Sequence, residues 1–184
     1  MTLNITPADR SAFLCLARQA IHGHLTHGSR PRLEGGIASE RLGAFVSLHI
    51  RGELRGCIGH PYADLPLGEV IVRCAVSAAS EDPRFPPLTL AELQAANIEI
   101  SVLGPIEPVG DVEEIEVGRH GLIVADGYCK GLLLPQVATE RGWDRETFLA
   151  HTCLKAGLRR DAWLTGAQLF RFEAEVFAEQ PAAS

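Results

Sequence analysis

Apolar residues recur at helical spacing in several stretches of the chain. The first stretch follows Thr6-Pro7, where a capping residue precedes a proline suited to the first helical position, and its apolar stripe ends at Leu25. A second apolar stripe covers residues 67–79, and a third follows Asp144 and ends before Gly157. The pair Thr89 and Glu92 has the spacing of a capping box and predicts a further short helix.

Apolar and polar residues alternate in the segments that we predict as strands. These segments are residues 44–50, 54–58, 97–103, 122–125, 128–134 and 169–177. Asp126-Gly127 predicts a hairpin turn. Because hairpins rather than regular helical crossovers join most strands, the pattern predicts an α+β fold with a mostly antiparallel sheet flanked by helices.

The alternation in the first hairpin makes a prediction about its register. It places Leu48 and Ile50 on the core side, and Leu54 and Ile58 with them. Matching these faces requires a bulge or an odd-numbered loop near residues 51–53, since a slip of one residue exchanges the two faces of a strand. Ser47 should then lie near Cys57, and His49 near Arg55.

Composition and charge exclude some classes of function. The chain has 184 residues and a net charge of −6, which disfavours nucleic-acid binding, because that binding depends on cationic side chains. No apolar run has the length of a membrane span, so no membrane association is predicted. The five cysteines form no CxxC pair, and the N-terminus lacks the layout of a signal peptide. A cytoplasmic protein with reduced cysteines is therefore expected.

Cys57 is the sharpest candidate for chemistry. Gly56 and Gly59 flank it and would allow backbone or a ligand to approach the strand closely, and Arg55, two positions earlier, should share its face. In one interpretation Cys57 is a nucleophile or covalent handle in a cleft; in the other it is a packed core residue. Arg55 would bind an anion, or pair with an acid such as Glu53.

Further candidates lie elsewhere in the chain. Asp82 and Arg84 in a proline-rich loop would contact a ligand, or would form a structural bridge with Phe85 plugged into the core. His120, between two glycines, is a candidate ligand-binding residue. His49 and His60 could supply a base to Cys57, although no third orienting residue is indicated.

No metal or cofactor is predicted. The histidines His22, His24 and His27 lack an acidic residue at metal-ligand spacing, so a solvated helix end is expected there. The glycines match no phosphate-binding pattern.

The segment Leu54-Arg55-Gly56-Cys57-Ile58-Gly59 resembles the signature hexapeptide of the AMMECR family. Further blocks follow in the family's order at residues 82–88, 98–103, 118–122, 133–138, 143–144, 148–149 and 153–158. The resemblance spans roughly residues 10 to 178. One departure is His60, where several relatives carry threonine or tyrosine.

The resemblance implies one domain over residues 1–184, with a larger lobe from both chain ends and a smaller lobe from the middle. It implies no known activity, and it suggests an association with Memo-like and radical-SAM proteins. We therefore expect a cytoplasmic protein whose inter-lobe cleft, lined by Arg55 and Cys57, binds or acts on a small anionic molecule. The alternative is a non-catalytic regulatory or protein-interaction module.

Overall fold

The computed structural model describes residues 3–180, which divide into two compact units. The terminal unit combines residues 3–103 with residues 175–180, and the middle unit comprises residues 104–174. Strand β7 (Gln168–Ala178) contributes residues to both units.

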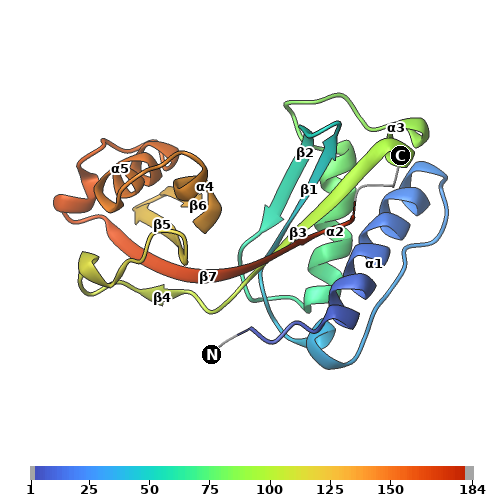
Figure 1. Ribbon diagram of the computed structural model, residues 1–184, viewed down its shortest axis with the longest axis horizontal. Helices are drawn as coiled ribbons and strands as arrows, with labels where there is room; N and C mark the ends of the chain where they lie inside the picture. Colours follow the sequence, from blue (N-terminus) through green and yellow to red (C-terminus); the bar gives the residue numbers. More distant parts are fainter. Residues whose placement is uncertain (1–2, 181–184) are drawn as a thin grey trace. The chain divides into compact units, whose positions relative to one another are not determined.

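The terminal unit sets helices against one face of an antiparallel sheet (Figure 1). Its helices are α1 (Pro7–Leu25), α2 (Leu67–Ser80), α3 (Leu90–Ala95) and the 3-10 helix η1 (Gly36–Ser39). Its strands are β1 (Ala44–Ile50), β2 (Glu53–His60) and β3 (Ala96–Leu103). The strand order β2-β1-β3 places β2 at the edge of the sheet.

The core of the terminal unit lies between this sheet and the helices. Alternate residues of β1 and β3 are fully buried on that side, namely Val46, Leu48, Ile98, Ile100 and Val102. They pack against the apolar stripes of α1 and α2, which include Phe13, Ile21, Leu67 and Ile71. The opposite face of the sheet therefore carries the polar members of the alternation.

Local capping begins two of these helices as the sequence predicts. Thr6 accepts the backbone N–H of Asp9 at 3.2 Å, and Asp9 accepts the N–H of Thr6 at 3.0 Å. Thr89 and Glu92 form the same reciprocal pair at 3.2 and 2.9 Å. Both capping boxes are confirmed.

The hairpin of β1 and β2 has a tight turn and a bulge. Arg51 and Gly52 both have positive φ, at 54° and 82°, as a tight hairpin turn of the favoured hand requires. The register shifts between Leu48, which lies opposite Gly56, and His49, which lies opposite Leu54. Arg55 is the additional residue of this bulge.

The bulge confirms one part of the predicted register and corrects another. Ser47 lies opposite Cys57, as predicted. His49 lies opposite Leu54 rather than Arg55, and Leu54 is 38% exposed rather than on the core side. The extra residue interrupts the alternation of β2, so residues on either side of the bulge cannot be assigned to faces by simple counting.

The middle unit is a smaller α+β assembly. Its strands are β4 (Glu107–Pro108), β5 (His120–Asp126), β6 (Cys129–Leu133) and the first part of β7, and β5 pairs antiparallel with both β6 and β7. Its helices are α4 (Pro135–Glu140), α5 (Arg145–Lys155) and the 3-10 helices η2 (Val112–Glu114) and η3 (Ala162–Leu164). The predicted hairpin is confirmed, with Asp126 opposite Cys129.

The core of the middle unit rests on α5. Asp144 caps this helix by accepting the N–H of Thr147 at 2.8 Å. Phe148 and Leu149 are fully buried against Ile115 and Leu122. The predicted fold class, α+β with antiparallel strands flanked by helices, is thereby confirmed. Within residues 3–180, no helix combines the length and the apolar character needed to cross a membrane.

Candidate functional site

The Cys57 side chain lies half-buried on the sheet face opposite the helices. Its partner across the ladder is Ser47, whose hydroxyl donates to Sγ at 3.2 Å. A serine hydroxyl directed at a cysteine sulfur holds the side chain in one orientation. Cys57 is therefore neither fully exposed nor enclosed in the core.

The backbone of Cys57 is held from the outer edge of β2. Its N–H donates to Asp82 Oδ2 at 2.8 Å, and its carbonyl accepts from Arg84 Nη2 at 3.3 Å. Because β2 is an edge strand, these two groups have no neighbouring strand to bond. The loop residues take the place of that strand, so the position of the thiol is fixed by residues 25 and 27 positions away along the chain.

Asp82 and Arg84 form a bidentate ion pair. Arg84 Nε and Nη2 lie 2.9 and 2.7 Å from the two carboxylate oxygens of Asp82, which is only 4% exposed. The guanidinium beside Asp82 holds the pKa of that carboxyl well below its usual range. Arg84 also lies over the ring of half-buried Phe85. The pair thus forms the structural bridge that was one of the two interpretations of this loop.

Arg55 is not available to an external anion. Its Nε and Nη2 donate to the two oxygens of Glu92 at 3.0 and 3.2 Å, and its Nη1 donates to the carbonyl of Pro86 at 2.9 Å. The guanidinium lowers the pKa of Glu92 to about 2. Of the two interpretations of Arg55, pairing with an acid is the one observed, but the acid is Glu92 and not Glu53, because the bulge directs Arg55 to α3 and the proline-rich loop.

The two glycines of the hexapeptide are required by packing within the protein. A Cβ at Gly56 would lie 2.1 Å from the carbonyl oxygen of Ala78 on α2, and a Cβ at Gly59 would lie 2.0 Å from the ring of Phe45. Gly56 therefore lets α2 approach the strand, and Gly59 makes room for an aromatic ring. Of the two approaches expected at these glycines, the approach of backbone is observed at Gly56, and the Phe45 ring fills the space at Gly59.

Glu99 extends the polar row that contains Cys57. Ser47 lies opposite Cys57 on one side and opposite Glu99 on the other, so thiol, hydroxyl and carboxylate follow one another across β2, β1 and β3. Within residues 3–180, the Glu99 carboxylate has no hydrogen-bond or ion-pair partner. Sequence reasoning missed Glu99 as a site residue, although the alternation of residues 97–103 placed it on this face.

The histidines considered as bases for Cys57 are placed elsewhere. His60 Nε2 lies 2.5 Å from Asp64 Oδ1. His49 lies in the row that also holds Leu54 and Asn97, next to the row of Cys57. Neither histidine forms a hydrogen bond with the thiol among the contacts of the described residues.

His120 belongs to the middle unit. It is buried, its Nδ1 accepts the backbone N–H of Glu116 at 3.0 Å, and burial is the main cause that lowers its pKa. The bond to Nδ1 leaves the proton of the neutral ring on Nε2. Arg119 beside it is shared between Glu116 and Glu173.

The other cysteines provide internal references for Cys57. Cys15 and Cys129 are exposed, whereas Cys74 and Cys153 are buried, and burial raises the pKa of the Cys74 thiol to about 12. Among residues 3–180, no group of His, Cys, Asp and Glu side chains is arranged to hold a metal ion.

Comparison with known proteins places the chain in one family. The model of the AMMECR1 family matches residues 14–177. A protein from Methanosarcina mazei is 43% identical over 187 residues, which cover 96% of this chain and 94% of the relative. Protein MJ0810 from Methanocaldococcus jannaschii is 49% identical over 152 residues, covering 78% and 76%.

A solved structure agrees with the fold. The crystal structure of the uncharacterised protein PH0010 from Pyrococcus horikoshii is similar with a TM-score of 0.86 and 42% sequence identity, covering 92% of this chain and 91% of that one. The names of these relatives state no activity, so the function of the family remains unknown. The chain belongs to the AMMECR1 family.

Proposed function

We propose that the chain binds a small molecule on the polar sheet face of the terminal unit, with the Cys57 thiol as the group that meets it. The observation that carries the proposal is the row of Cys57, Ser47 and Glu99, in which a half-buried thiol, a hydroxyl and a carboxylate without a partner in residues 3–180 follow one another. A buried cysteine that merely fills space would have apolar neighbours instead.

The surrounding residues act as positioning residues in this proposal. Asp82 and Arg84 hold the backbone of Cys57, and Arg55 ties β2 to α3 through Glu92. Such supports keep a reactive side chain in one geometry. Gly56 contributes by letting α2 pack closely beneath the strand, and Gly59 by leaving room for the Phe45 ring on the same face as the thiol.

We propose a ligand class other than the small anion that the sequence led us to expect. The Arg55 guanidinium is bonded to Glu92 and to the Pro86 carbonyl, and the carboxylate of the row, Glu99, lies on the far side of Ser47 from the thiol without a partner within residues 3–180. A ligand with a cationic or hydrogen-bond-donating group would meet Glu99, because a carboxylate accepts only. The unpaired cysteines fit a reducing compartment such as the cytoplasm.

Alkylation of the thiol tests this proposal. The double variant Cys15→Ser, Cys129→Ser leaves Cys57 as the one cysteine that is not buried, and the matched variant Cys57→Ser, Cys129→Ser leaves Cys15 exposed instead. With iodoacetamide at neutral pH, Cys57 should be labelled faster than Cys15 although it is less exposed. Labelling of Cys57 that is slower than that of Cys15, or that requires unfolding, would overturn the role of the thiol.

A second candidate function is a protein-interaction module, and one observation favours it. Tyr128 is fully exposed at the tip of the hairpin of β5 and β6 in the middle unit. Exposed aromatic side chains are common anchors in protein interfaces. The Memo-like and radical-SAM partners implied by the family resemblance belong to this candidate. Loss of binding to a purified Memo-like or radical-SAM protein in Tyr128→Ser, with unchanged labelling of Cys57, would support it.

A further inference from the structure

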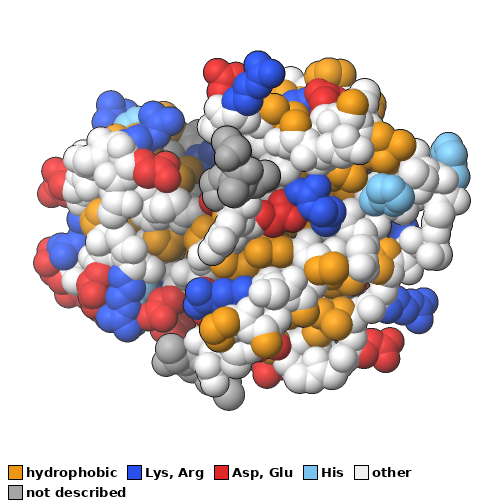
Figure 2. All heavy atoms as spheres, turned by 45° about the vertical axis from the view of Figure 1, so that its right-hand side comes forward, with side chains coloured by type: hydrophobic (Ala, Val, Ile, Leu, Met, Phe, Trp, Pro, Cys, Tyr) orange, Lys and Arg blue, Asp and Glu red, His pale blue; other side chains and the backbone are white. Residues whose placement is uncertain are grey.

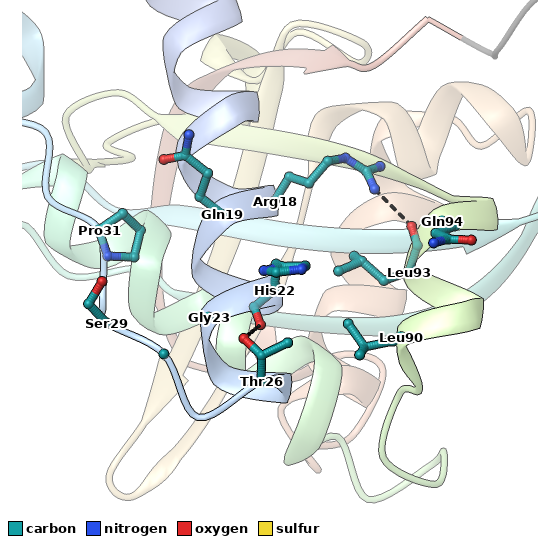
Figure 3. A pocket seen from close by; sticks show the side chains of 11 residues that line it. Arg18, Gln19, His22, Gly23, Thr26, Ser29, Pro31, Leu90, Leu93 and Gln94 are labelled. Carbon is teal, nitrogen blue, oxygen red and sulfur yellow. Dashed lines mark hydrogen bonds between the residues drawn. The ribbon is translucent and has the colours of Figure 1, made fainter.

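A groove of about 700 Å³ lies in the terminal unit, away from Cys57 (Figure 3). Residues of α1 from Arg18 to Gly23 form one wall, the loop of residues 26–31 forms another, and α3 contributes Leu90, Leu93 and Gln94. The volume lies in the range of small-molecule sites, roughly 300–1,000 Å³.

The walls of the groove are held firmly. A Cβ at Gly23 would lie 2.6 Å from the carbonyl oxygen of Ser29, and the N–H of Gly28 donates to the Gly23 carbonyl at 2.7 Å. The loop therefore packs directly on α1. Thr26 donates its hydroxyl to the carbonyl of His22 at 2.8 Å, which closes the end of the helix beneath the His22 ring.

Few charged side chains of the groove are available to bind a ligand. Arg18 lines it, but its guanidinium donates to Glu179 and to the carbonyls of Leu93 and Ala96. His22 is the other lining residue that can carry a charge. Because the positive charge of Arg18 is matched by Glu179, the groove favours an uncharged ligand.

Apolar side chains form the opposite side of the groove from the His22 ring. In Figure 3, Leu90 and Leu93 project from α3 toward His22, and Gln94 lies beside them. Leu93 is buried, whereas Leu90 is 42% exposed on the first turn of α3. On the face shown in Figure 2, histidine side chains likewise lie beside hydrophobic ones. An apolar surface with a few hydrogen-bonding side chains around it is typical of a ligand site.

We propose that this groove binds a small uncharged molecule with an apolar body and an amide-like edge. The apolar body would rest on Leu90 and Leu93, and the edge would bond His22 and Gln94, which have no hydrogen-bond partner for their side chains within residues 3–180. The site is separate from the row of Cys57 and does not depend on its chemistry. The histidine cluster is thus divided in role, since His24 and His27 do not line the groove.

Nuclear magnetic resonance titration with benzamide tests this inference. Benzamide combines an apolar ring with an amide, while benzoate and benzylamine have the same ring with a negative or a positive charge. Benzamide should shift the ring signals of His22 saturably, with the signals assigned by His22→Gln. The affinity of each charged probe should be lower than that of benzamide by about tenfold or more, because a charge would lose its hydration without gaining a partner.

Two matched variants locate the binding. Leu90→Glu places a charge in the groove and should abolish the shift, while Leu154→Glu changes a similarly exposed leucine, 46% exposed, on α5 and should leave it unchanged. The absence of a saturable shift, its persistence in Leu90→Glu, or tighter binding of a charged probe would each overturn the proposal. The proposal for Cys57 is tested by alkylation and not by this titration, so the failure of one proposal can be distinguished from the failure of the other.

Discussion

Asp82 accepts the backbone N–H of Cys57 at 2.8 Å with the same carboxylate that binds the guanidinium of Arg84. A single buried side chain thus ends the hydrogen-bond ladder of an edge strand and holds the position of the thiol. This hydrogen bond links the hexapeptide of residues 54–59 to residues 82–88, which form another block of the family resemblance.

Replacing Asp82 should loosen the outer edge of β2. Asp82→Ala leaves the N–H of Cys57 without its acceptor and should cost roughly 1–3 kcal/mol of unfolding free energy. Asp82→Asn keeps an oxygen acceptor but loses the charge, so its loss should be smaller. Urea unfolding measures the stability, and hydrogen exchange at the Cys57 amide reports the local effect. An unchanged exchange rate in Asp82→Ala would show that this bond is not structural.

Stability should fall in acid because of the lowered carboxyl pKa values. The folded pKa of Glu92 is about 2, and that of Asp82 is also lowered, whereas unfolded carboxyls titrate near about 4. The stabilisation is therefore complete above about pH 4 and is lost as the pH falls toward 2. Unfolding free energy measured from pH 5 to 2 should decline less steeply in Glu92→Gln than in the unaltered chain. Equal slopes would contradict the assignment.

Arg55→Lys should reduce stability. Lysine keeps the charge but cannot reproduce the fork that bonds Glu92 and the Pro86 carbonyl, so a loss of about 1–2 kcal/mol is expected. Arg160→Lys, at an exposed arginine without an ion pair among the described residues, is the control and should change the unfolding free energy little. If Arg55→Lys is as stable as the control variant, the structural role is contradicted and a role of Arg55 in ligand binding is favoured instead.

Gly56→Ala should be among the more damaging single substitutions. Its Cβ would meet the Ala78 carbonyl at 2.1 Å, so α2 or β2 must move, at a cost above about 2 kcal/mol. Gly28→Ala is the comparison, because a Cβ there has no neighbour closer than 3.5 Å. Thermal melting of both variants decides whether the glycine serves packing; equal melting temperatures would argue that it does not.

Ser47→Ala should alter the thiol more than the fold. The variant removes the hydroxyl that donates to Cys57 Sγ, and a half-buried hydrogen bond contributes only about 0.5–1.5 kcal/mol to stability. The alkylation rate of Cys57 should therefore change several-fold while the melting temperature shifts slightly. Asn97→Ala, in the adjacent row, is the control. The same alkylation rate in both variants would remove Ser47 from the site.

Part of the site could be predicted from the sequence because it depends on neighbours across one hairpin. Apolar alternation required a bulge or odd loop near residues 51–53, and this placed Ser47 beside Cys57. It could not locate the bulge at Arg55, because several positions satisfy the same alternation. Leu54 and His49 were consequently misplaced.

The sequence by itself determined the features whose partners are close along the chain. The capping boxes at Thr6 and Thr89 and the hairpin at Asp126 join atoms a few residues apart, so local preferences suffice to specify them. Only the tertiary structure decided that Arg55 pairs with Glu92, 37 positions away, and that Gly56 makes room for α2. Such contacts depend on how helices pack on the sheet, and any of several acids in the chain would satisfy an arginine equally well until packing selects one.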